Sequence, residues 1–113
     1  HAEKYNELLS RVDNIVTPAT HQNAKHVFHL YVIRSENRDE LQTYMKQNGI
    51  STGIHYPTAL PYLKAYEYLG HPPLDYPVAH EYSGEILSLP MYAELESNTI
   101  KIISDVLNNF SRA

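Results

Sequence analysis

The sequence predicts an α+β domain in which helices pack on one face of a small sheet. Three short runs have the length and composition of strands, at residues 27–33, 50–56 and 86–89. Segments with the apolar spacing of amphipathic helices flank each run. No glycine-rich turn joins a strand to a helix, and the sequence therefore does not predict a nucleotide-binding βα unit.

The first helix is predicted near the N-terminus. Its apolar residues recur at i, i+3, i+4 and i+7, and they are Tyr5, Leu8, Leu9 and Val12. Residues 13–24 are polar, contain Pro18 and show no period, which indicates a loop. The following run, 27–33, is rich in β-branched and aromatic residues and predicts a strand.

The helix between the first two strands carries clear end signals. Asn37 is predicted to cap it through its side-chain oxygen, with Glu40 at the reciprocal third position. Gly49 supplies a left-handed stop, after which Ile50 is predicted to fold back on Met45.

A long excursion separates the second and third strands. The strand at 50–56, which completes a β-α-β unit, ends at Pro57 because proline cannot donate to a ladder. Residues 58–76 hold four tyrosines and four proline or glycine residues. This pattern predicts an ordered loop with at most a turn or two of helix around 62–68, and such loops are more often functional than idle.

The C-terminal part returns to regular structure. Pro77 suits the first position of a short helix that Gly84 ends. The strand at 86–89 is closed by Pro90, and Ser97 is predicted to cap the last helix. The apolar stripe of that helix comprises Ile100, Ile103, Leu107 and Phe110.

Composition limits the classes of function. The chain has 113 residues, and its 9 basic and 13 acidic side chains give a formal net charge of −4, which disfavours nucleic acid as a partner. It contains no cysteine, no membrane-length apolar run and no signal-peptide pattern, so we expect a soluble cytoplasmic protein with no membrane partner. It starts at His1 without a methionine and within a helical pattern, and we therefore expect a piece of a longer polypeptide.

Catalytic chemistry is not predicted within the chain itself. Its seven histidines suggest a metal site, but His26 and His29 would point to opposite faces of a strand, and the His80-Glu81 pair lacks a second histidine at Gly84. The five lysines lie in polar or amphipathic settings, whereas a Schiff-base lysine must be desolvated. We therefore predict no catalytic, cofactor-binding or metal-binding residue.

The candidate substrate-binding residues are His55 and Tyr56. Gly53 permits close backbone approach near the end of its strand, which then delivers an imidazole and a phenol side by side at the start of the proline-rich loop. Such a pair is placed to hydrogen-bond a ligand. The alternative is structural, with Tyr56 packed in the core, its hydroxyl satisfied, and His55 facing water.

Four blocks of sequence resemble a known family. They are Thr52-Gly53-Ile54-His55-Tyr56-Pro57, Ala65-Tyr66 with Leu69-Gly70, Tyr76-Pro77-Val78-Ala79, and Ile86-Leu87-Ser88-Leu89-Pro90-Met91. In this order they resemble the C-terminal domain of the DegT/DnrJ/EryC1/StrS aminotransferases, and the likeness extends from about Ile15 to Leu107. Many members have a histidine after a Pro-Leu pair, where this chain has Ala59-Leu60-Pro61.

The resemblance implies the small C-terminal domain of the aspartate-aminotransferase fold, with a mainly antiparallel sheet, at residues 15–113, and the end of an interdomain helix at 1–14. It implies a bacterial enzyme, dependent on pyridoxal phosphate, that moves an amino group from an amino acid such as glutamate to a nucleotide-linked keto-sugar. An N-terminal large domain would supply the Schiff-base lysine and hold most of the cofactor, so this chain is expected to be inactive alone. The full-length protein would form a homodimer, and His55 and Tyr56 would orient the substrate sugar or its diphosphate.

This arrangement of two domains has a consequence for the surface of the isolated chain. The stripe of the first helix and the tyrosine-rich loop would be exposed apolar surface in the isolated chain, as is common where a partner is missing.

A second class of function stays open, namely a free-standing α+β ligand-binding or regulatory module. An RNA-binding sheet is disfavoured because Phe28 and Tyr31 would lie on opposite faces.

Overall fold

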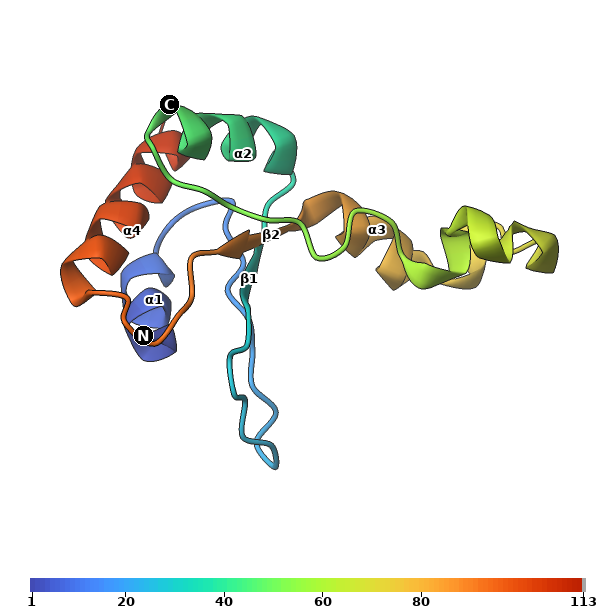
Figure 1. The fold of residues 1–113 in the computed structure, drawn as a ribbon, viewed down its shortest axis with the longest axis horizontal. Helices are drawn as coiled ribbons and strands as arrows, with labels where there is room; N and C mark the ends of the chain where they lie inside the picture. Colours follow the sequence, from blue (N-terminus) through green and yellow to red (C-terminus); the bar gives the residue numbers. More distant parts are fainter. Residues whose placement is uncertain (113) are drawn as a thin grey trace.

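The computed structural model describes residues 1–112 of the chain. Four α-helices and two strands make up its regular structure, together with three short 3₁₀ helices (Figure 1). In chain order the elements are α1 (Ala2–Leu9), β1 (Tyr31–Arg34), α2 (Arg38–Gln47), η1 (Leu60–Tyr62), η2 (Lys64–Leu69), η3 (Pro73–Asp75), α3 (Pro77–Glu85), β2 (Ile86–Leu89) and α4 (Ser97–Ser111).

The sheet is narrow and antiparallel. Strand β1 pairs with β2, with Tyr31 opposite Leu89. Single bridges widen the sheet on both sides, from Val16 to β1 and from Gly53 to Ser88 of β2, and both are antiparallel. Since β1 and Gly53 are each antiparallel to β2, they run parallel to one another on either side of it. The predicted β-α-β unit is therefore present in reduced form, and the α+β class is confirmed.

Both predicted outer strands are shorter than the sequence indicated. The strand predicted at 27–33 begins only at Tyr31, because its partner β2 ends at Leu89 and the next residue, Pro90, has no amide hydrogen to extend the ladder. Phe28 has a φ of 49°, and its amide donates to His26 Nδ1 at 2.8 Å. The prediction that His26 and His29 occupy opposite faces of a strand is therefore wrong, because neither residue lies in one.

The strand predicted at 50–56 is reduced to the bridge at Gly53. Its first residue, Ile50, instead closes helix α2, because its amide bonds to Met45 O at 2.9 Å. Gly49 has the predicted left-handed conformation, with a φ of 75°. Together these contacts form the helix stop that the sequence predicted.

The two predicted N-caps differ from the structure. Asn37 is the N-cap of α2, but its side chain makes no capping hydrogen bond in the described part of the chain. Ser97 is the first helical residue of α4, so the cap position falls on Glu96.

The core lies between the sheet and helices α1, α2 and α4, which agrees with the predicted packing of helices on one face. The ring of Tyr5 in α1 stacks on Tyr31 of β1 at a centroid distance of 4.7 Å. Tyr5 Oη donates to Pro90 O at 3.0 Å, and Tyr31 Oη donates to Asn6 Oδ1 at 2.6 Å. The expectation that the stripe of the first helix is exposed is therefore wrong. Tyr5 and Leu9 of α1 and Val12 just after it are buried, since α1 packs against α4 and Tyr5 also packs on Tyr31.

This pair of buried phenols predicts a loss of stability in alkali. Burial raises the pKa of Tyr31 from 10.0 to about 12, and burial together with the neighbouring Tyr31 and Tyr92 phenols raises that of Tyr5. The unfolded chain releases these protons near pH 10 while the folded chain retains them, so their contribution is complete below pH 10 and declines above it. The part that comes from Tyr31 is lost by about pH 12. Denaturant titrations should show this decline, and Tyr31→Phe should reduce it. A constant midpoint across this interval would contradict the assignment.

Residues 57–85, here called the arm, stand away from the core. Figure 1 shows η1, η2, η3 and α3 projecting together to one side of the sheet. None of the arm's residues, all of which the structure describes, is buried. The radius of gyration is 15.4 Å, whereas a compact domain of this length has about 13 Å. The larger value is expected for a molecule in which one part projects from the core. The 3₁₀ turns confirm the predicted ordered loop.

Among residues 1–112 no helix is both long and apolar enough to cross a membrane.

Candidate functional site

The two candidate residues, His55 and Tyr56, lie where the chain leaves the sheet and enters the arm. Both are exposed, and the Tyr56 side chain is 73% accessible. Their rings meet edge to face at a centroid distance of 5.7 Å, and the peptide bond that joins them is cis. The structural alternative, in which Tyr56 packs in the core, is therefore wrong. The residues are neighbours at the surface, and whether they contact a ligand stays a prediction.

Residue Gly53 makes room for the imidazole of His55. A Cβ placed on Gly53 would lie 2.7 Å from His55 Cε1, which is closer than side-chain atoms approach one another. The backbone of Gly53 is held at the same time by Ser88, through N–H···O bonds of 3.1 and 2.7 Å. Gly53 is therefore required for close approach, as the sequence predicted, and the group that approaches is the imidazole of the same segment.

The Ser88 side chain reaches the same imidazole. His55 Nδ1 and Ser88 Oγ are 2.9 Å apart. Ser88 lies on β2 with only 4% of its surface accessible, whereas His55 is exposed. The central strand thus holds His55 by its Nδ1 side.

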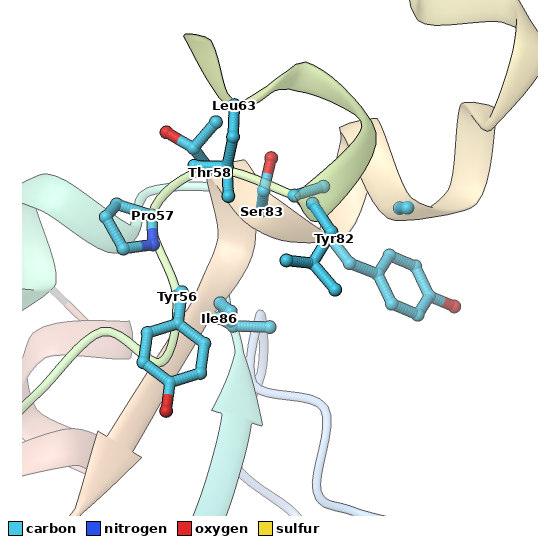
Figure 2. A pocket seen from close by; sticks show the side chains of 10 residues that line it. Tyr56, Pro57, Thr58, Leu63, Tyr82, Ser83 and Ile86 are labelled. Atoms are coloured by element: carbon cyan, nitrogen blue, oxygen red, sulfur yellow. The ribbon is translucent and has the colours of Figure 1, made fainter. Parts of the chain in front are cut away.

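A mainly apolar cavity of about 530 Å³ opens beside Tyr56 (Figure 2). Residues 56–60 and Leu63 line it from the start of the arm, and Ala79, Tyr82, Ser83 and Ile86 line it from α3 and β2. In Figure 2 the phenol ring of Tyr56 lies at the lower left of this group and that of Tyr82 extends to the right, away from the other labelled side chains. The cavity has the volume of a small-molecule site, but most of its lining side chains are hydrocarbon.

Two arginines fix the base of the arm to the core. Arg34 of β1 donates to Glu85 Oε2 at 2.9 Å, and its guanidinium lies 3.8 Å from the centroid of the Tyr82 ring. Arg38 of α2 is 9% accessible and donates to the carbonyls of Ser83 and Ile86 at 3.4 and 3.2 Å. These contacts hold the end of α3 against β1 and α2.

The described residues do not fit pyridoxal phosphate by themselves. Four of the lysines, Lys25, Lys46, Lys64 and Lys101, are exposed, and Lys4 is half-buried with Glu7 Oε2 at 3.9 Å. A lysine that forms a Schiff base must be desolvated, and none of these positions removes its amine from water. Residues 1–112 also contain no group of three His, Cys, Asp or Glu residues arranged to hold a metal ion.

No role was predicted for Ser88, Arg34 or Arg38 from the sequence. One signal for Ser88 was present: it is a hydroxyl residue inside the apolar run 86–89, and a buried hydroxyl needs a hydrogen-bond partner. The arginines gave no such signal, because an arginine at a strand or helix end is ordinarily a solvated charge.

The chain is similar in sequence to a known family of proteins. It matches the DegT/DnrJ/EryC1/StrS aminotransferase family over residues 1–108. It is 46% identical over 90 residues to the erythromycin biosynthesis sensory transduction protein EryC1 of Saccharopolyspora erythraea, a match covering 80% of this chain and 25% of that protein. It is 32% identical over 108 residues to the UDP-2-acetamido-2-deoxy-3-oxo-D-glucuronate aminotransferase of Pseudomonas aeruginosa, covering 96% of this chain and 29% of the enzyme.

The fold has a close match among solved structures. DesV of S. venezuelae, determined in complex with a ketimine intermediate, superposes with a TM-score of 0.95 at 29% identity. The match covers 99% of this chain and 30% of DesV. The chain therefore spans between a quarter and a third of the length of each of these three proteins.

Proposed function

Because this chain belongs to the DegT/DnrJ/EryC1/StrS aminotransferase family, we propose that it is the small C-terminal domain of an enzyme that aminates a nucleotide-linked keto-sugar. The domain would occupy residues 15–113, with the end of an interdomain helix at 1–14. The full-length enzyme would take the amino group from an amino acid such as glutamate. The observation that carries the proposal is the family match over residues 1–108, and the exposed pair of His55 and Tyr56 at the base of the arm supports a role in substrate binding.

We assign the cofactor chemistry to another part of the protein because this chain has no desolvated lysine. Members of this family act with pyridoxal phosphate, which serves as an electron sink for amino-group transfer when bound. The lysines of this chain are solvated, so the Schiff-base lysine would come from the large domain and the chain alone would be inactive. Its own contribution would be a wall of the cleft and hydrogen bonds that orient the substrate.

His55 and Tyr56 are suited to bind oxygen-rich ligands. An imidazole N–H and a phenol O–H can each donate to a sugar hydroxyl or a phosphate oxygen, and the phenol can also accept. Both rings are exposed in the isolated chain, so no rearrangement of the core would be needed for contact. The partners of the domain would be its own large domain, a second subunit of a homodimer and the nucleotide-sugar, in a cytoplasmic bacterial protein.

Substrate binding by these two residues predicts a kinetic effect in the full-length enzyme. His55→Ala and Tyr56→Phe should each raise KM for the nucleotide-sugar by about three- to tenfold, as expected for one hydrogen bond of about 0.5–1.5 kcal/mol. Their effect on KM for the amino donor should be small. Steady-state kinetics with each substrate varied in turn measures both values. Unchanged sugar kinetics in both variants would contradict the proposed role.

One observation favours a second function, because the relative from S. erythraea bears the name of a sensory transduction protein. A regulatory module would bind the same class of ligand without turning it over. The two functions differ in a direct assay. Full-length protein that binds nucleotide-sugar but shows no amino transfer with any amino acid tested would support the regulatory function.

A further inference from the structure

Resting on the proposed role of His55, we infer that Ser88 is a positioning residue that holds the His55 imidazole as the tautomer protonated on Nε2. The inference goes beyond the assignment of His55 as a ligand contact. It states which ring nitrogen meets the substrate, what kind of atom it recognises, and which buried residue determines this.

The first step concerns the proton of the serine. Ser88 is 4% accessible, and within residues 1–112 its Oγ hydrogen-bonds only to His55 Nδ1. If Nδ1 carried the proton and donated to Oγ, the hydroxyl hydrogen of Ser88 would have no acceptor in a buried place. A buried donor without a partner is disfavoured. The arrangement that satisfies both groups has Ser88 Oγ–H donating to an unprotonated Nδ1.

The second step concerns the opposite side of the ring. With Nδ1 unprotonated, the neutral imidazole carries its hydrogen on Nε2. His55 is exposed, and its Nε2 makes no hydrogen bond to any other described residue. Nε2–H is therefore an available donor, and it selects for an acceptor oxygen such as a phosphate or sugar oxygen.

The third step concerns the orientation of the ring. Gly53 Cα lies against the ring on one side, since a Cβ there would meet Cε1 at 2.7 Å, and Ser88 holds Nδ1 from β2. Two backbone bonds of 2.7 and 3.1 Å join Gly53 to Ser88. The main chain of Ser88 thus holds Gly53, and its side chain holds the His55 ring. Because the ring is already ordered, it loses less conformational entropy when it binds a ligand.

The inference is tested with two unlike variants in the full-length protein. Ser88→Ala removes the hydroxyl, and Gly53→Ala retains it but displaces the ring. Ser104→Ala is the matched control, because Ser104 is also a buried serine, at 3% accessible, whose Oγ donates to Ile100 O within α4. Isotope-labelled histidine reports the tautomer by nuclear magnetic resonance, and loss of a signal in His55→Ala identifies the residue.

The expected result has two parts. Wild-type protein and Ser104→Ala should show His55 protonated on Nε2, whereas Ser88→Ala and Gly53→Ala should show a mixture of tautomers. KM for the nucleotide-sugar should rise by about three- to tenfold in Ser88→Ala and Gly53→Ala, and Ser88→Thr should restore it. In a His55→Ala background, Ser88→Ala should cause no further rise, because Ser88 acts through His55.

The outcomes separate this inference from the proposed function. A His55 signal that remains protonated on Nε2 in Ser88→Ala, or is protonated on Nδ1 in the wild type, would overturn the role of Ser88 whatever the kinetics show. A tautomer that changes as expected, while His55→Ala leaves KM for the sugar unchanged, would confirm the positioning by Ser88 and reject His55 as a substrate contact.

Discussion

Replacing Leu107 with alanine is expected to lower the free energy of unfolding by about 2–5 kcal/mol, because it leaves a cavity at the centre of the core. Leu107 lies on α4 and is 0% accessible. Helix α4 contacts both α1 and α2, so its buried side also supports their packing. A domain of this size has about 5–15 kcal/mol of stability in total, and the change would remove a large share of it.

Ile102 provides the matched control on the same helix. Its side chain is 51% accessible, and Ile102→Ala should change the free energy of unfolding by no more than about 0.5 kcal/mol. Denaturant titration of both variants measures the difference directly. Equal losses for Leu107→Ala and Ile102→Ala would mean that α4 does not bury the side assigned to it.

The elements that the sequence predicted best are those whose signals are local. The stripe of α4 extends over about three turns, and three of its four apolar residues, Ile100, Ile103 and Leu107, are buried. The end of α2 depends on two adjacent residues. Gly49 has the predicted left-handed conformation, and Ile50 folds back to bond Met45 as predicted. Such features require only the chain's own neighbours in sequence.

The elements that the sequence predicted poorly depend on partners distant in the chain. Residues 27–30 have strand-forming side chains, but the four-residue β2 and Pro90 offer them no ladder. Burial of the α1 stripe depended on α4, which lies about 90 residues further along the chain. Neither the composition of the chain nor the hydrophobic period of α1 indicates which distant helix will pack against it.

The same distinction applies to the candidate site. Its His55-Tyr56 pair is visible in sequence because the two residues are adjacent and precede a proline-rich loop. The contact from Ser88 to His55 joins residues 33 positions apart, and the two arginines reach the arm over 45 positions or more. The resemblance to the family, which rested on the order of four blocks, is confirmed by the match over residues 1–108.

The arm carries several large apolar side chains that are exposed to solvent. Leu60 lines the cavity beside Tyr56 and is 69% accessible in the isolated chain, and the arm also exposes Tyr68 and Leu74 at 80% and 85%. Under the proposed function, a large domain of the same polypeptide would cover this surface, since the chain spans only 25–30% of the length of the three proteins compared above. Leu60→Asp would then place an unpaired carboxylate in an apolar contact.

We expect Leu60→Asp to uncover the apolar surface of the arm while the core stays folded. An interface position of this kind contributes about 2 kcal/mol or more, so kcat/KM for the nucleotide-sugar should fall by about thirtyfold. Trypsin cleavage after Lys64, which lies in η2, should accelerate by at least about tenfold. Thermal unfolding of the core should be unchanged, because Leu60 is exposed outside it.

Ile102→Asp introduces the same charge on the exposed side of α4 and should leave cleavage at Lys64 unchanged. Protection of Lys64 by the large domain of the same chain should not depend on protein concentration, whereas protection by a second copy should disappear on dilution. If the wild-type protein is already cleaved after Lys64 as fast as Leu60→Asp, the arm is free in the full-length protein. In that case the apolar surface of the arm is not the contact that closes the cleft.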